Sequence, residues 1–370
     1  MPQTIIPAEL LKKSDKILFI AHLALGDFTY LQNFFQAFKR AHPQLQVHLW
    51  VDEVRRTSDE SQWKHLEKYS LYDWVAACPF FDKIYTRTYS PALYQQSIRE
   101  AQQEHYPLVV SLATLRPHLY AALAREISPD GFVVGMKKRV KFYQPHHQLA
   151  YRKLNAAIPP YSVERSNPQH ISDVYAHWFL QIGGLEVSAA ERFPFVDIPA
   201  QWRQYAQEKL AGWGFRNAEG RQGKLVFINP YAKTKKRCWP LEHVAELIIA
   251  MKQQDAWRDS CFIVNAVPQE LAHARQVISS YQLERTELFS AEENFFQLPA
   301  VLECCDLIIS VETAVMHLAN AVHVPVIALM RQKNPEWVPI DRANSTVITA
   351  PNRRDWVKAV TVEQVMKAMQ

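Results

Sequence analysis

Short apolar runs alternate with longer amphipathic stretches along the first part of the chain. Four runs predict buried strands: KILFIA (16–21), QVHLWV (46–51), LVVSL (108–112) and FVVG (132–135). The stretch between the first two predicts a helix that ends before Pro43, because its apolar residues recur at spacings of three and four. These residues are Phe28, Leu31, Phe34, Phe35 and Phe38.

The same alternation starts again at residue 225. Further strands are predicted at LVFIN (225–229), CFIVN (261–265), DLIISV (306–311) and VPVIAL (324–329). Helices are expected from about Pro240, from Pro268 and from Thr313. Strands that alternate with helices predict an α/β protein with parallel sheets buried on both faces.

Two such series predict two Rossmann-like domains, residues 1–184 and 225–350. The polar, turn-rich stretch 185–224 is the expected linker between them. The end of the chain, residues 351–370, is expected to form a helix that packs back on the N-terminal domain. Thr361 and Gln364 have the spacing of a capping box at its start.

Composition narrows the class of protein. Hydrophobic residues make up 48% of the 370 positions and charged residues 21%, and no apolar run is long enough for a membrane span. The first residues lack a secretory signal pattern, and the five cysteines contain no C-x-x-C pair, so a reducing cytosol is expected. Only 9 glycines are present, which argues against a glycine-rich phosphate loop.

Ligands of open parallel sheets bind beyond the carboxyl ends of the strands. In AHLALGDFTYL, Gly26 and Asp27 follow the first strand and open a helix. Taken alone, Asp27 is explained first as a helix N-cap, which contributes about 1 kcal/mol, and second as a carboxylate that acts as a general base. A single glycine here does not make a dinucleotide-binding fingerprint.

A basic loop follows the strand that ends at Asn229, in INPYAKTKKRCWPLEHVAEL. Its cations are well placed to meet a phosphate, although a solvated loop explains any single lysine as well. They are Lys233, Lys235, Lys236 and Arg237.

The stretch SVETAVMHLANA predicts a helix N-terminus directly after a strand. Free backbone N–H groups and the helix dipole at Thr313 suit a diphosphate, and the Glu312 carboxylate suits sugar hydroxyls. His317 lies four residues on, on the same face. A hydrogen-bonded core histidine explains His317 as well.

A second basic cluster, KKRVKFYQPHH, spans Lys137 to His147, with Arg116 upstream. Its mixture of cations and aromatic rings is compatible with an anionic acceptor, with nucleic acid or a lipid surface, and with a solvated loop. His146, His147 and His170 lack metal-ligand spacing, so no metal site is predicted.

Four blocks in order resemble the heptosyltransferase family, the glycosyltransferases of lipopolysaccharide core synthesis. They are the opening strand with its G-D turn, PLVVSLATLRPHLYAALA, the basic loop with its W-P helix start, and the stretch FFQLPAVLECCDLIISVETAVMHLANAVHVPVIALMRQKNPEWVP, which is similar to the family's D-T-G-x-x-H-x-A-A motif. This sequence departs from the motif at Glu312 and Ala314, and carries Asn265-Ala266 where the family usually has a glycine pair.

The resemblance implies a GT-B architecture, two Rossmann-like domains that face each other across a cleft. It implies a general base at Asp27, with acceptor-binding residues Gly26, Arg116, Lys137, Lys138 and Arg139. It also implies that the C-terminal half binds the donor through Asn229, Tyr231, Lys233, Thr234, Lys236, Arg237, Asn265, Glu312, Thr313, Ala314, Val315 and His317.

The expected function is therefore inverting transfer of a sugar, heptose from ADP-heptose, to a lipopolysaccharide-core or related glycan acceptor. No metal, other cofactor or nucleic-acid partner is expected, and the enzyme is expected in the cytoplasm, at most peripheral to the inner membrane. A non-catalytic nucleotide-sugar or glycan-binding protein, or a sugar-nucleotide epimerase, is the alternative.

Overall fold

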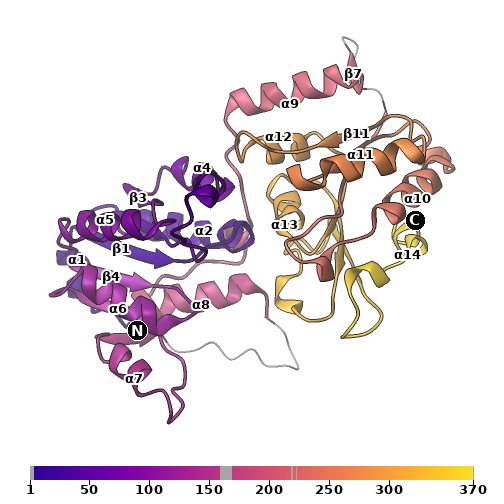
Figure 1. Ribbon diagram of the computed structural model, residues 1–370. Helices are drawn as coiled ribbons and strands as arrows, with labels where there is room; N and C mark the ends of the chain where they lie inside the picture. Colours follow the sequence, from indigo (N-terminus) through magenta and orange to yellow (C-terminus); the bar gives the residue numbers. More distant parts are fainter. Residues whose placement is uncertain (1–3, 159–168, 218–219, 222, 370) are drawn as a thin grey trace. The chain divides into compact units, whose positions relative to one another are not determined.

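The protein is represented by a computed structural model that describes residues 4–158, 169–217, 220–221 and 223–369. The chain divides into two compact units, Met1–Arg192 and Phe193–Gln370. In the described part, each unit is built on a parallel six-stranded sheet with helices packed on it (Figure 1). The predicted α/β class is confirmed.

The first sheet has the strand order β3-β2-β1-β4-β5-β6. Its strands are β1 (Lys16–Ala21), β2 (Gln46–Val51), β3 (Lys83–Tyr85), β4 (Leu108–Ser111), β5 (Phe132–Met136) and β6 (Ala156–Ile158). The helices of this unit are α1 (Ala8–Lys13), α2 (Leu25–Ala41), α3 (Trp63–Glu67), α4 (Ser70–Ala76), α5 (Pro91–Gln102), α6 (Pro117–Ile127), α7 (Pro145–Tyr151) and α8 (Ile171–Gly183).

Aromatic packing attaches α2 to this sheet. All five apolar residues predicted for its buried face are at most 1% exposed. The Phe19 ring of β1 lies 5.1 Å from the Phe35 ring and 5.3 Å from the Phe38 ring, both edge-on. Phe179 of α8 stacks on Phe19 at 5.8 Å. Because such rings bury a large apolar area, this cluster packs the second half of α2 against β1.

The second sheet repeats the topology, with the order β11-β10-β9-β12-β13-β14. Its strands are β9 (Leu225–Asn229), β10 (Cys261–Asn265), β11 (Thr286–Phe289), β12 (Leu307–Val311), β13 (Val326–Met330) and β14 (Ser345–Thr349). The helices are α9 (Ala200–Gly212), α10 (Leu241–Lys252), α11 (Leu271–Ser280), α12 (Gln297–Glu303), α13 (Ala314–Ala321) and α14 (Val362–Lys367), and β7 (Arg216–Asn217) pairs with β8 (Gly220–Arg221).

The expected domain boundaries need correction. The stretch 185–224 is not simply a linker, because α9 lies within it and packs against α12 of the second unit, with Ala206 and Leu210 buried. The division between the units falls earlier, after Arg192. Only these two positions of α9 are buried, so its sequence lacks the apolar stripe that would have predicted it.

The last helix also packs differently from the expectation. The predicted capping box of Thr361 and Gln364 is present, but α14 packs against α10 of its own unit. Val365 belongs to the core of the second unit, so the apolar surface of α14 is used within its own unit. In the part of the chain that is described, no helix combines the length and apolar character needed to cross a bilayer.

Trp239 anchors the segment before α14 to the second core. Its indole is 2% exposed and its Nε1–H donates to the Val360 carbonyl at 2.9 Å. We expect Trp239→Phe to lower the free energy of unfolding by about 1–3 kcal/mol, because it leaves a buried carbonyl unsatisfied. Urea unfolding measures this, with the more exposed Trp356→Phe as control. Equal stability of the two variants would contradict the anchoring role.

Candidate functional site

The strand order of the first sheet reverses between β1 and β4, which is where open α/β sheets bind ligands. His22 follows β1 at this point, and its Nε2 accepts a hydrogen bond of 2.8 Å from the Leu115 backbone N–H beyond β4. An accepting Nε2 places the proton of the neutral imidazole on Nδ1. Burial lowers the pKa of His22, which favours this neutral form.

Asp27 lies in the first turn of α2, next to His22. Its Oδ1 accepts a hydrogen bond of 3.1 Å from the Tyr175 hydroxyl and its Oδ2 one of 3.2 Å from the Ala24 N–H. Burial raises the pKa of Asp27 above its ordinary value, and these two hydrogen bonds and His22 offset part of the rise. The residue as a whole is partly exposed, and desolvation of its carboxyl group is the main cause of the raised pKa.

The helix-cap explanation of Asp27 needs correction. Helix α2 begins at Leu25 with Ala24 as its N-cap, so Asp27 is the third helical residue and Gly26 the second. The carboxylate does bond back to the Ala24 N–H, but the N-cap position itself has no polar side chain. Tyr175 then supplies a second hydrogen bond that helix capping does not require.

The second sheet has the same reversal between β9 and β12. Asn229 ends β9 and is paired in register with Ser310 of β12. The Asn229 Nδ2 lies 3.0 Å from the Ser310 Oγ and 2.9 Å from the Thr313 Oγ1, and its Oδ1 accepts from Asn265 Nδ2 at 2.8 Å. Four side chains from three neighbouring strand ends therefore form one polar network.

Thr313 connects this network to helix α13. It is the N-cap residue, and its Oγ1 accepts from the Val315 N–H at 3.3 Å. Thr313 and Ala314 are partly exposed, whereas Val315 and His317 are buried. The predicted helix N-terminus is thus present, with its N-cap residue and first helical residue partly exposed. His317 packs 5.9 Å from the Trp337 ring, measured between ring centroids.

Glu312 is held by two arginines. Its Oε1 contacts the Arg331 Nε, and the Arg237 Nε lies 3.4 Å from the same oxygen. Glu312 is 5% exposed, so this carboxylate is paired and its access to sugar hydroxyls is limited. Two guanidinium groups facing one carboxylate leave an excess positive charge beside the N-terminus of α13, which suits an anion.

The other predicted donor residues lie in the loop after β9. Lys233, Thr234 and Lys236 are exposed, and the Lys236 ammonium is 6.0 Å from the centre of the Trp356 ring. Tyr231 is half-buried against the core, and its hydroxyl has no hydrogen-bond partner among the described residues. Burial raises the Tyr231 pKa, so the hydroxyl remains a donor.

The predicted acceptor residues are spread over three elements. Arg116 is the left-handed N-cap of α6, with φ 51°, and Lys137, Lys138 and Arg139 follow β5; all four are exposed. The Lys138 charge contributes to lowering the His22 pKa, which relates this cluster to the surroundings of Asp27.

The structure brings His118 of α6 against His146 and His147 of α7. The His118 and His147 rings stack at 3.6 Å between centroids, and His146 lies 4.4 Å from His147. Among the described residues, no group of three or more His, Cys, Asp or Glu side chains has an arrangement that could hold a metal ion.

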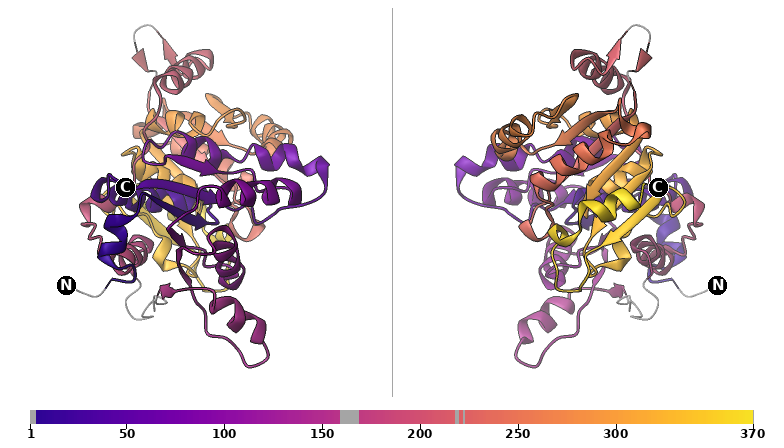
Figure 2. Two further views of the ribbon diagram at one scale, coloured as in Figure 1. Left: turned by 90° about the vertical axis from the view of Figure 1, so that its left-hand side faces the viewer. Right: turned by 90° about the vertical axis from the view of Figure 1, so that its right-hand side faces the viewer.

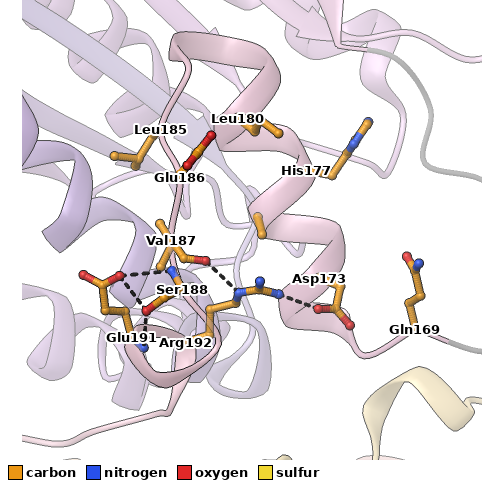
Figure 3. Close-up of a pocket in the computed structure, with 11 residues that line it drawn as sticks. Gln169, Asp173, His177, Leu180, Leu185, Glu186, Val187, Ser188, Glu191 and Arg192 are labelled. Carbon is orange, nitrogen blue, oxygen red and sulfur yellow. Dashed lines mark hydrogen bonds and ion pairs between the residues drawn. The ribbon is translucent and has the colours of Figure 1, made fainter. Parts of the chain in front are cut away.

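A surface pocket of about 820 Å³ lies elsewhere in the first unit, between α8 and residues 185–192 (Figure 3). Its polar groups bond to each other. Arg192 pairs with Asp173 and donates to the Val187 carbonyl at 3.0 Å, and the Ser188 hydroxyl donates to Glu191 at 2.8 Å. The pocket contains none of the predicted site residues.

The sequence did not single out four residues of these two sites: His22, Tyr175, Ser310 and Arg331. His22, Ser310 and Arg331 stand at carboxyl ends of predicted strands, so strand position was an available signal. Tyr175 is 148 positions from Asp27, and nothing in its local sequence indicates the contact.

Comparison with known proteins agrees with this architecture. The family model described as glycosyltransferase family 9 (heptosyltransferase) matches residues 97–366. No curated protein matches the sequence. The solved structure of a family 9 glycosyltransferase from Veillonella parvula has a TM-score of 0.74 and 19% identity, over 96% of both chains.

Two Escherichia coli structures are also similar. ADP-heptose lipopolysaccharide heptosyltransferase II has a TM-score of 0.67 and 13% identity, over 96% of this chain and 97% of that one. Heptosyltransferase WaaC with ADP has a TM-score of 0.61 and 16% identity, over 96% of both chains. At these identities the structural matches establish the fold, and the matched family segment 97–366 begins after Asp27.

The raised pKa of Asp27 predicts a pH-dependent effect on stability. A carboxyl whose pKa is raised on folding stabilises the protein below its unfolded pKa and loses that contribution as the pH rises through its folded pKa. We therefore expect Asp27→Asn to gain stability relative to the wild type as the pH rises toward neutrality. Urea unfolding across this range measures the difference.

Tyr175→Phe provides the matched comparison, because it removes a hydrogen bond that lowers the Asp27 pKa. In that variant the loss of stability that accompanies ionisation of Asp27 should occur at higher pH. If the difference in the free energy of unfolding between Asp27→Asn and the wild type stays constant with pH, the raised pKa of Asp27 is contradicted.

Proposed function

Because the chain belongs to glycosyltransferase family 9, the heptosyltransferase family, we propose that it transfers a heptose from ADP-heptose to a hydroxyl of a lipopolysaccharide-core or related glycan acceptor. The family's chemistry is glycosyl transfer. The observation that supports a nucleotide-sugar donor is the excess positive charge of Arg237 and Arg331 beside the capped N-terminus of α13.

The proposed donor site is in the second unit. Free N–H groups of the first turn of α13 and the guanidinium groups would bind the diphosphate. The Asn229 network would hold Thr313 in place as the cap. ADP-heptose is the favoured donor because the similar E. coli structures include an ADP-heptose heptosyltransferase and an ADP complex.

The proposed base is Asp27 in the first unit. Asp27 would take the proton from the acceptor hydroxyl while the oxygen of that hydroxyl attacks the anomeric carbon of the donor. The bond from that carbon to the diphosphate breaks, and the nucleoside diphosphate leaves with the electron pair. A single displacement of this kind inverts the anomeric configuration.

We propose that protein cations serve here in place of a metal ion or other cofactor. The charge that develops on the leaving diphosphate would be stabilised by Arg237, Arg331 and the N–H groups of α13. The raised pKa of Asp27 brings the base closer to neutral pH, which improves proton transfer provided that the carboxylate is ionised at the working pH.

The base assignment predicts that Asp27→Asn lowers the rate of transfer from ADP-heptose to truncated lipopolysaccharide by about 10²–10⁴-fold. The affinity for ADP should stay unchanged, because Asp27 belongs to the other unit. Release of ADP and calorimetry measure the two quantities. Asp15→Asn, at an exposed position of the same unit, is the control, and full turnover of Asp27→Asn would exclude Asp27 as the base.

The donor assignment predicts that Arg237→Gln and Arg331→Gln each weaken ADP binding by about tenfold or more, the effect of losing one charge-assisted hydrogen bond. Calorimetry measures the affinities. Arg275→Gln, at an exposed cation of α11 outside this loop, should bind ADP normally. An equal loss of ADP affinity in all three variants would contradict the assignment and indicate a nonspecific charge effect.

Thermal stabilisation by a panel of ADP-, UDP-, GDP- and CMP-sugars tests the choice of nucleotide, because stabilisation grows with the ratio of ligand concentration to Kd. The largest shift is expected with ADP-heptose. Binding without transfer to any acceptor would favour a non-catalytic nucleotide-sugar-binding protein.

A further inference from the structure

His22 connects the end of β1 to the loop between β4 and α6. These elements belong to the first unit, drawn from indigo to magenta in Figures 1 and 2. The two strands are paired so that Ile20 lies beside Ser111, and the Leu112 N–H donates to the Ile20 carbonyl at 2.8 Å. Beyond the strands, the His22 Nε2 accepts from the Leu115 N–H, also at 2.8 Å. A side chain thus continues the connection where the backbone pairing ends.

The exposed part of this loop depends on that bond. Residues 112 and 113 are buried, whereas residues 114–116 are exposed. Within the described part of the chain, the bond to His22 is the only hydrogen bond between residues 114–116 and any segment outside α6. Arg116 has a left-handed φ of 51°. Such a conformation is unfavourable for a residue with a side chain, so it persists only where neighbouring contacts hold it.

His22 is surrounded by charged groups from several elements. Its charge is affected by Asp27 of α2, Asp52 after β2 and Lys138 after β5, and the Tyr120 ring of α6 lies 5.8 Å from its ring, measured between centroids. Burial is the main cause that lowers the pKa of His22, and Lys138 lowers it further, while the two carboxylates raise it. The lowered pKa favours the uncharged imidazole.

Only the uncharged imidazole can form the bond to the loop. With its proton on Nδ1, it has a lone pair on Nε2 that accepts from the Leu115 N–H. The imidazolium carries a proton on both nitrogens, so protonation would place two donors opposite each other. Residues 114–116 would then lose their connection to β1.

We propose that His22 is a positioning residue that holds Arg116 in place for the acceptor glycan, beside the base Asp27. The proposal rests on the proposed function, and on Arg116 as an acceptor-binding residue. In this role His22 touches neither substrate, because it acts through the Leu115 backbone. Since the bond requires uncharged His22, acceptor affinity should fall in acid as His22 becomes protonated.

The first test is the affinity for deacylated lipopolysaccharide core, measured by calorimetry without a donor at neutral to slightly alkaline pH. His22→Leu should weaken binding by about three- to tenfold, the effect of losing one hydrogen bond. His22→Gln should stay within about twofold of the wild type, because its Oε1 can accept the same bond. At saturating acceptor, kcat should change less than about threefold in either variant, unlike the loss expected for Asp27→Asn.

His42→Leu is the matched control. His42 is also a partly buried histidine of the first unit whose pKa is lowered by burial, but it lies at the opposite end of α2. This variant should bind the acceptor as the wild type does. The affinity for ADP should be the same in all three histidine variants, and thermal unfolding verifies that each is folded.

The pH dependence distinguishes positioning from a purely structural contribution. In the wild type, acceptor affinity should fall as the pH drops below the ordinary histidine pKa of about 6.5, because the pKa of His22 is lowered. His22→Gln cannot be protonated and should lack this part of the fall. Acidic groups of the acceptor titrate alike with both proteins, so the difference between the two profiles belongs to His22.

Two further measurements test whether His22 acts through the loop. In the Arg116→Gln background, His22→Leu should weaken acceptor binding little further, because residues that act together have non-additive effects. Hydrogen–deuterium exchange of residues 112–119, measured without substrates, should be faster in His22→Leu than in the wild type and in His42→Leu.

Four results would overturn the proposal: no acceptor binding by the wild type, unchanged affinity in His22→Leu, identical pH profiles of His22→Gln and the wild type, or fully additive effects with Arg116→Gln. Failure of the proposed function is distinguishable from these. A wild-type enzyme that binds the acceptor but releases no ADP would refute the transfer, whereas the binding and exchange measurements would still decide the role of His22.

Discussion

Parallel strands that are covered by helices on both faces have almost no room for polar side chains along their length. The central strands β1, β4, β9 and β12 obey this constraint, since nearly every residue in them is buried and apolar. In these four strands, the polar side chains therefore stand at or next to a strand end. The two exceptions inside the second sheet, Asn229 and Ser310, are terminal or next to terminal and bond to each other.

The two units use this constraint for different chemistry. In the first, the strand end carries His22, whose pKa is lowered by burial, and the first turn of α2 carries a carboxylate whose pKa is raised by burial. In the second, the strand ends carry amides, hydroxyls and paired guanidinium groups beside the N-terminus of α13. Under the proposed function, one topology would provide a proton acceptor and, separately, an anion site, the two functions that displacement of a nucleoside diphosphate requires.

The pairing of Glu312 changes how the departure from the family motif is understood. A carboxylate at this position was expected to meet sugar hydroxyls. Its burial and its contacts with Arg237 and Arg331 make it a group that positions cations. The Glu312 carboxylate contacts both guanidinium groups, so the substitution would bear on the phosphate end of the proposed donor site.

The local sequence pattern was sufficient to predict the central strands, α2 with its phenylalanines and the capping box of α14. Burial periodicity and cap chemistry are encoded in residues that are close together in the sequence. The local pattern did not predict the edge strands β3, β6, β11 and β14, or α9, whose burial patterns are weaker. Asp27, Asn229 and Thr313 were predicted as candidate site residues because they stand at or just after the carboxyl ends of predicted strands.

The contacts that give these residues their properties depend on tertiary structure. Tyr175 reaches Asp27 from α8, Asn265 reaches Asn229 from the next strand, and Arg331 reaches Glu312 from β13. The sequence alone therefore determined which residues stand at the strand ends. Only the packed sheets decided the pKa of Asp27 and the pairing of Glu312, because desolvation and ion pairing depend on neighbours that are distant along the chain.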